Sequence, residues 1–339
     1  MVKNLEKLSG LPGVSGGEHA VREYILTKIK RYASEITVNG QGSVIALKKG
    51  EKPGSRRLMV SAHMDEVGLI VTYICDDGML KFTSVGGIDP SVLCGRAVSV
   101  GENRVTGVIG IVPIHLSRGE AKSKIPDINE MYIDIGAPSR AEAEKLVSPG
   151  DLCCFETQFE PFGDGMLKGK ALDDRAGCAV LLELIKQQFP CDIYFVFTTQ
   201  EEVGLRGAGC AAYTVDPDTA IVVEATTAAD IAGVEEQDQV CRLGGGAVVG
   251  FMDKRTIYDR ELYELALDLA RMKGIKAQIK QAVAGGNDAG AIQRTRGGVR
   301  TLAVSLPCRY LHSPASVIAE SDLKSVCELV GELLYTLSI

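Results

Sequence analysis

A chain of 339 residues, of which 45% are hydrophobic and 24% charged, has the composition of an ordinary globular protein. Lys and Arg number 37 against 44 Asp and Glu, and the formal net charge of −7 argues against nucleic-acid binding, which depends on cationic contacts to phosphate. The apolar runs are far shorter than the roughly 18 residues of a membrane helix, and the charged N-terminus lacks the apolar stretch of a signal peptide. Ten scattered cysteines without a C-x-x-C pair are typical of reduced thiols, so we expect a cytoplasmic enzyme.

The first predicted element is a helix. Apolar residues recur at helical spacing over 15–32, and Ser15 followed by Glu18 predicts a capping box at the start of this helix. Residues 13–17 also satisfy the pattern G-x-S-x-G. No strand precedes them, as a nucleophile elbow requires, so the pattern favours capping over catalysis.

Short strand-like runs dominate the next part of the chain. Two strands are predicted at 43–47 and 57–62, and between 67 and 159 many short β-like runs are separated by turn pairs. These runs lie at 69–74, 80–83, 97–100, 106–112 and 131–135, with one short helix at 140–146. The pattern predicts a small β-barrel or sandwich.

From residue 170 onward, helices alternate with apolar strands. Helices are predicted at 174–187, 204–212, 258–272 and 321–337, and strands at 193–198, 220–223, 276–281 and 301–305. This order predicts an α/β sandwich with a mostly parallel sheet. We therefore expect a catalytic domain formed by 1–66 and 160–339, interrupted by an inserted β-barrel domain at 67–159.

Acidic and histidine side chains gather where predicted strands end, which is the edge where open α/β sheets place their ligands. Each has an ordinary structural explanation by itself, such as a helix cap for Asp173 or a core position for His63. Together, acids without partners would repel one another, and bound divalent cations would relieve that repulsion. A set of histidines and carboxylates suits zinc first, with cobalt or manganese as alternatives, rather than calcium. The residues are His63, Asp173, the pair Glu201-Glu202, Glu224 and His312.

The adjacent glutamates Glu201 and Glu202 add chemistry to this set. One carboxylate can bind a metal while its neighbour takes a proton from water. Spacing by itself does not decide which of the two has which role. Asp65 follows His63 by two residues, a position from which it can accept the other N–H of a metal-bound imidazole.

Six motifs occur in order along the chain: SAHMDEVG at 61–68, ALDDRAG at 171–177, TQEEVG at 199–204, VEAT at 223–226, GGNDAG at 285–290 and LHS at 311–313. Together they strongly resemble the co-catalytic metallo-aminopeptidases of the glutamyl aminopeptidase type, the tetrahedral (TET) peptidases. The resemblance covers essentially the whole chain. It implies a zinc-peptidase-like three-layer sandwich with an inserted β-barrel used for assembly and access.

The same resemblance implies a role for each site residue. Glu201 would be the general base, and Asp65 would support His63. Two divalent ions would be bound, with Asp173 bridging them. The implied ligand sets are His63, Asp173 and Glu224 for one ion, and Asp173, Glu202 and His312 for the other. Two positions depart from the family pattern, because Glu224 is often Asp in such enzymes and Asn287 is commonly Thr.

The implied activity is the removal of N-terminal residues from peptides, with a water between the two metals as nucleophile. The resemblance also implies a homo-oligomer, commonly a dodecamer built from dimers, whose sites face an internal cavity. His115 of a neighbouring subunit could approach a site in such an assembly, whereas His19 is expected on an exposed helix and Cys153-Cys154 in a buried strand.

Two other classes of function stay open from the sequence. A related two-metal amidohydrolase, such as a deacetylase or carboxypeptidase, would need a cationic pocket for the carboxylate of its substrate. A non-catalytic assembly protein would have no reason to keep Glu201 beside Glu202. The preferred N-terminal residue also stays open, since the sequence does not place Arg206, Arg294 or Arg309 in a substrate pocket.

Overall fold

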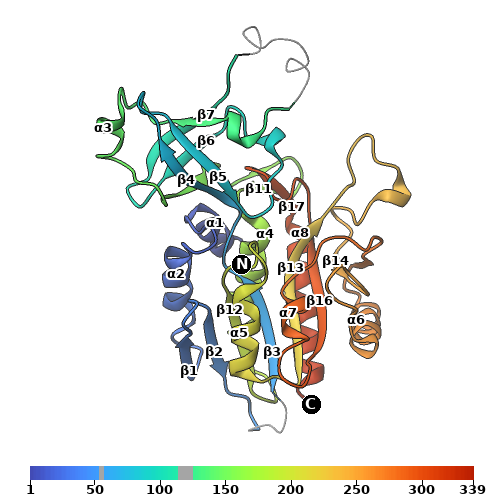
Figure 1. Ribbon diagram of the computed structural model, residues 1–339. Helices are drawn as coiled ribbons and strands as arrows, with labels where there is room; N and C mark the ends of the chain where they lie inside the picture. The colour runs from blue at the N-terminus through green and yellow to red at the C-terminus, as the bar shows by residue number, and fades with distance from the viewer. Residues whose placement is uncertain (53–56, 114–124) are drawn as a thin grey trace.

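The computed structural model describes residues 1–52, 57–113 and 125–339, so His115 lies outside the described part. An α/β body carries a β-barrel at the upper end of the view in Figure 1. The helices are α1 (Val2–Gly10), α2 (His19–Ile29), α3 (Arg140–Ala143), α4 (Leu172–Leu184), α5 (Arg206–Val215), α6 (Arg260–Lys273), α7 (Ala289–Ile292) and α8 (Glu320–Leu337). None of the helices in these described ranges is both long and apolar enough to cross a membrane.

The body is built on an eight-stranded sheet with the order β1-β2-β12-β3-β13-β16-β14-β15. Its central strands β12, β3, β13 and β16 run parallel to one another, and their long apolar runs are buried on both faces. The strands are β1 (Glu35–Val38), β2 (Val44–Lys48), β3 (Leu58–His63), β12 (Ile193–Thr198), β13 (Thr219–Thr227), β14 (Ala247–Val249), β15 (Ala277–Ile279) and β16 (Arg300–Cys308).

Helices cover the sheet in two groups. In one group, α4 packs on β3 and β13 and contacts α1, α2 and α8, while α6 packs on α8. In the other group, α5 packs on β12 and contacts α7, which packs on β13 and β16. The buried side chains of these helices and of the sheet form one continuous hydrophobic core. The result is an α/β sandwich, as expected from the order of the elements, with the three layers that the family resemblance implied.

The barrel is closed by six antiparallel strands in the order β4-β5-β8-β7-β6-β9. It has a hydrophobic core of its own, separate from that of the body. These strands are β4 (Gly68–Ile74), β5 (Leu80–Val85), β6 (Ala97–Val100), β7 (Val105–Gly110), β8 (Tyr132–Asp134) and β9 (Leu152–Phe155). A small antiparallel sheet of β10 (Glu160–Phe162), β11 (Met166–Gly169) and β17 (Ser316–Ala319) follows in the order β10-β11-β17. The predicted fold class, a mostly parallel α/β sheet with a β-barrel, is confirmed.

The N-terminal part of the sequence prediction needs correction. Helix α2 begins only at His19, and its N-cap residue Glu18 makes no side-chain capping bond to the helix. The Ser15 hydroxyl instead donates to the Asp65 carboxylate at 2.6 Å, so the predicted capping box is wrong. Helix α1 was not expected, although Leu5 and Leu8 on its apolar face are completely buried.

A buried ionic cluster joins the end of β3 to the start of α4. The Arg175 side chain is completely buried and donates to the carbonyls of Met64 at 2.7 Å and Leu8 at 2.6 Å. It also pairs with Glu66 at 3.2 Å, and the Lys170 ammonium donates to both Glu66 oxygens at 2.7 Å. Because buried charges require such partners, the cluster fixes the positions of the segments on either side of it.

Replacing Arg175 by Met tests this cluster. The substitution keeps an apolar stem but removes the hydrogen bonds to two buried carbonyls and one of the two cations at Glu66. We expect the free energy of unfolding, measured by urea denaturation, to fall by about 3–5 kcal/mol. Arg300→Met removes half-exposed ion pairs to Asp259 and Glu261 and should cost less than about 1 kcal/mol. Equal losses in the two variants would contradict the importance given to the buried cluster.

Candidate metal centre

The parallel strands bring the sequence-predicted residues to one edge of the sheet. His63 ends β3 and lies opposite Thr198, the last residue of β12. Ser61 of β3 lies opposite Val222 of β13, so His63 and Glu224 each lie two residues further along adjacent strands. Glu201 and Glu202 follow β12, His312 lies between β16 and β17, and Asp173 is at the start of α4. Figure 1 shows that this edge of the sheet faces the barrel.

The His63 ring lies next to the carboxylates of both Asp173 and Glu224. The His63 Nε2 atom lies 3.2 Å from Asp173 Oδ1 and 3.6 Å from Glu224 Oε2. His63 is 1% exposed and Glu224 4% exposed, so water competes little for these atoms. His63 also belongs, with Asp173 and Glu202, to a group of ligand atoms that all lie within 4.8 Å of one another. One nitrogen and two carboxylate oxygens form a set that a small divalent cation can bind.

A second group forms on the other side of Asp173. The His312 Nε2 atom lies 3.5 Å from Asp173 Oδ2 and 3.2 Å from Glu202 Oε2. Asp173 therefore presents one carboxylate oxygen to each histidine. A carboxylate placed in this way can bridge two cations, one in each group.

Asp174 joins the cluster although the sequence analysis gave it no role. It is completely buried, and its carboxylate forms a group with His63 and Glu224 whose ligand atoms all lie within 4.8 Å of one another. Asp174 Oδ1 accepts from the Gly177 amide at 2.9 Å. Within the described residues, Asp174 Oδ2 and Glu224 Oε1 are buried without a hydrogen-bond partner. Buried oxygens without a hydrogen-bond partner are costly in free energy, and a bound cation would supply the missing partner. The adjacent pair Asp173-Asp174 was the available signal in the sequence.

The electrostatics of the cluster also favour a bound cation. Burial, together with the charge of Asp173, raises the pKa of Glu202 to about 8. Burial likewise raises the pKa values of Glu201 and Glu224 well above the usual range. Burial acts to lower the pKa of His312, but Asp173 and Glu202 outweigh this effect and raise it to about 9. Because these three glutamates resist ionisation and His312 holds its proton, the site is short of positive charge, which metal ions would supply.

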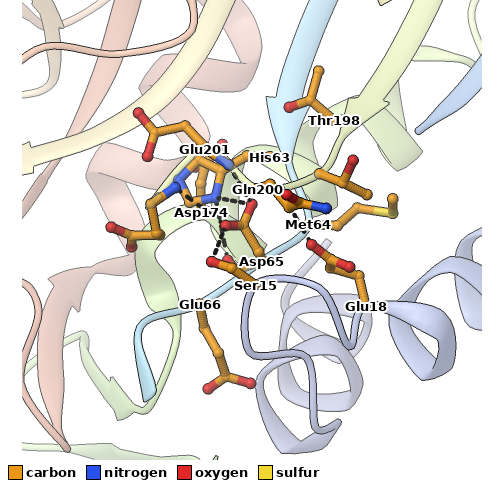
Figure 2. A network of polar contacts seen from close by, with 12 residues as sticks. Ser15, Glu18, His63, Met64, Asp65, Glu66, Asp174, Thr198, Gln200 and Glu201 are labelled. Atoms are coloured by element: carbon orange, nitrogen blue, oxygen red, sulfur yellow. Dashed lines mark hydrogen bonds and ion pairs between the residues drawn. The ribbon is translucent and has the colours of Figure 1, made fainter. Parts of the chain in front are cut away.

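Asp65 connects the histidine to the pair of glutamates (Figure 2). Its Oδ1 atom lies 3.4 Å from His63 Nδ1 and accepts the Glu201 amide at 3.0 Å. Its Oδ2 atom accepts the Glu202 amide at 3.1 Å and the Ser15 hydroxyl at 2.6 Å. Burial acts to raise the pKa of Asp65, but the contacts with His63 and Ser15 outweigh it and lower the pKa. The backbone carbonyl of Asp65 lies still closer to His63 Nδ1, at 3.2 Å. Asp65 is thus placed to orient the imidazole through both its carbonyl and its carboxylate, and the carboxylate also holds the turn that carries the glutamates.

The two neighbouring glutamates border different spaces. Glu201 lies in the wall of a cavity of about 130 Å³, together with Glu224, His312 and Asn287. Glu202 lies in the wall of a second, water-sized cavity of about 20 Å³. The larger cavity is the one in which a substrate could approach the cluster, and Glu201 is the member of the pair that faces it.

Lys280 is the one lysine or arginine among the described residues that line the larger cavity. Its ammonium donates to the Ala284 carbonyl at 2.9 Å, and burial lowers its pKa. The three arginines that the sequence left unplaced, Arg206, Arg294 and Arg309, are not part of this lining. Arg309 pairs instead with Asp230 at 2.7 Å.

Three other predictions concern residues away from the cluster. His19 is exposed at the start of α2, as expected. Cys153 and Cys154 are buried in β9, also as expected. His115 cannot be placed relative to any site, since it belongs to the segment outside the described ranges.

Solved structures with this architecture are known. A TET aminopeptidase from Thaumarchaeota archaeon SCGC AB-539-E09 superimposes with a TM-score of 0.95 at 34% sequence identity, over 99% of this chain and 96% of that one. The TET1 peptidase of Pyrococcus horikoshii, which can assemble into a tetrahedron or a large octahedral shell, has a TM-score of 0.86 at 36% identity, over 98% and 99% of the two chains. The similarity in fold to the TET peptidases therefore extends over almost the whole length of this chain.

Proteins that are similar in sequence point to the same family as the similar structures. A protein of Acetivibrio thermocellus that carries an aminopeptidase name is 41% identical over 97% of both chains. The lysyl aminopeptidase of Pyrococcus furiosus is 34% identical over 97% of this chain and 95% of its own length. The sequence profile of the M42 glutamyl aminopeptidases matches residues 42–329. With this match, these relatives and the shared fold, the chain belongs to the M42 glutamyl aminopeptidase family and is a peptidase.

Proposed function

We propose that the protein is a two-metal aminopeptidase that removes N-terminal residues from peptides. His63, Asp173 and Glu224 would hold one divalent ion, and Asp173, Glu202 and His312 the other. The observation that carries this proposal is the placement of Asp173, whose two oxygens lie 3.2 Å and 3.5 Å from two different histidines. Nitrogen and carboxylate ligands suit zinc, and also cobalt or manganese. Glu224, at a position where Asp is common, reaches His63 with its longer side chain.

The proposed mechanism gives each side chain a separate task. When bound, the two cations would acidify a water molecule and polarise the scissile carbonyl. Glu201, which faces the larger cavity and belongs to neither ligand set, would accept the proton of the water and then give it to the leaving amine. Asp65 would keep His63 oriented and the Glu201 backbone in place through the contacts described above.

The relatives that carry aminopeptidase names support peptides with a free N-terminus as substrates. The cavity beside Glu201 is where the end of such a peptide would lie. Lys280 in the wall of this cavity would meet a carboxylate, and we assign that carboxylate to the side chain of an acidic first residue. An amidohydrolase could use Lys280 for the terminal carboxylate of its substrate instead, which makes the two functions separable by experiment.

We further propose that the chain forms a homo-oligomer in the cytoplasm, a dodecamer built from dimers, in which residues 67–159 serve assembly and access. The assemblies of the P. horikoshii TET1 peptidase support the oligomer. The separate hydrophobic core of the barrel supports its treatment as a domain. No disulfide joins cysteines within the described residues, which is consistent with a reducing compartment.

A substrate panel tests the proposed function. The zinc-loaded protein should hydrolyse glutamyl p-nitroanilide faster than leucyl or lysyl p-nitroanilide and should leave N-acetylglutamate intact. Lys280→Met should lower kcat/KM for the glutamyl substrate about 10-fold or more, the size expected for loss of a charged contact, while the leucyl substrate changes little. Hydrolysis of N-acetylglutamate without release of p-nitroaniline would favour the amidohydrolase instead.

The pair Glu201→Gln and Glu202→Gln tests the division of roles. Glu201→Gln keeps the size of the side chain but cannot accept a proton, so turnover should fall about 10²-fold to 10⁴-fold with normal metal content. Glu202→Gln should also weaken metal binding, because an amide is a poorer ligand than a carboxylate. Metal stoichiometry by mass spectrometry and kcat for both variants are the measurements. If Glu201→Gln loses a metal while Glu202→Gln keeps both, the roles are reversed.

A further inference from the structure

Three consecutive backbone amides converge behind the pair of glutamates. Gln200 has a left-handed backbone conformation with φ of +56°, which few residues other than glycine adopt without support from their surroundings. The N–H groups of Gln200, Glu201 and Glu202 all donate to carboxylate oxygens. Successive amides that point into one concavity form an anion-binding nest.

Two carboxylates from different parts of the chain fill this nest. Asp65 accepts the amides of Glu201 and Glu202. The third amide, that of Gln200, donates to Glu18 Oε1 at 3.1 Å, and the same oxygen accepts the Gly16 amide at 2.9 Å. Figure 2 shows Glu18 directed toward Gln200, on the side of the turn where Asp65 also lies.

Glu18 is poorly explained as a surface or capping residue. It is only 4% exposed, and it makes no side-chain capping bond to α2. Burial raises its pKa, with Asp65 contributing in the same direction. A buried carboxyl close to a second one is costly, so its placement requires compensation. The hydrogen bonds from Gly16 and Gln200 supply that compensation.

We propose that Glu18 is a positioning residue for the general base Glu201. Its bond to the Gln200 amide fixes the peptide between Thr199 and Gln200 and holds Gln200 in the left-handed conformation. Asp65 holds the next two amides, so the turn is fixed at three successive points and Glu201 is directed into the larger cavity. Loss of the Glu18 bond would let this turn relax, and displacement of a catalytic group by about 1 Å can cost about 10²-fold in rate. The inference rests on the proposed function only for the catalytic role of Glu201.

The test compares Glu18→Ala, which removes the acceptor, with Glu18→Gln, which keeps a side-chain oxygen that can accept both amides. Glu23→Ala is the matched control, because Glu23 is an exposed acid on α2, the helix that Glu18 precedes. For each full-length, zinc-loaded variant, kcat and KM for glutamyl p-nitroanilide and zinc per chain are measured. Amide hydrogen exchange is followed by mass spectrometry in peptides that contain residues 199–203.

Glu18→Ala should lower kcat about 10-fold to 100-fold, with KM and zinc content unchanged and with faster exchange in 199–203. Glu18→Gln should restore most of kcat and of the exchange protection, and Glu23→Ala should match the wild type. Wild-type kcat in Glu18→Ala would overturn the proposal, as would loss of zinc in parallel with kcat, or a Glu18→Gln variant as impaired as Glu18→Ala. If the wild type releases no p-nitroaniline, the proposed function fails. Unchanged hydrogen exchange in Glu18→Ala is a separate result, which would reject the hydrogen bond between Glu18 and the Gln200 amide as a support of the turn.

Discussion

The geometry of the site depends on the carboxylate of Asp65. This one group contacts the His63 ring, accepts the amides of both glutamates and receives the Ser15 hydroxyl. It therefore links the end of β3 to the turn after β12 and to the segment before α2. A carboxylate can accept several hydrogen bonds at once in directions that a neutral amide cannot match. The positions of a proposed ligand and of the proposed base are thus set by the same atoms.

Glu66, the residue that follows Asp65, ties this arrangement to the segment around the start of α4. Glu66 pairs with Lys170 and Arg175, both of which lie close in sequence to Asp173. The segment that carries His63 and Asp65 is consequently tied to the segment that carries Asp173 by buried ionic contacts. Such contacts resist displacement, since separation of the partners would leave charges buried alone. The parallel sheet supplies the remaining alignment, because adjacent strands end at the same edge.

The sequence predicted the fold class and the members of the cluster because both depend on local patterns. Apolar runs followed by His63 or Glu224 mark strand ends, and strand ends meet at one edge once the sheet is parallel. The role of Glu18 depends on a contact with Gln200, which is 182 residues away, and no local pattern reports it. Ser15 was assigned to a helix cap for the same reason, because its true partner Asp65 is 50 residues distant. The sequence shows that Asp174 is adjacent to Asp173. Its burial close to Glu224 results from the packing of α4 on the sheet, which the sequence does not show.

In the proposed site, Asp173 would lie between two cations held by the histidine and carboxylate groups of this cluster. An anomalous difference map, recorded at the zinc absorption edge from crystals grown with zinc, tests it most directly. We expect two peaks in each chain, one beside His63 and Glu224 and the other beside Glu202 and His312, with Asp173 between them. A single peak, a peak bound by Glu201, or no peak at Asp173 would contradict it.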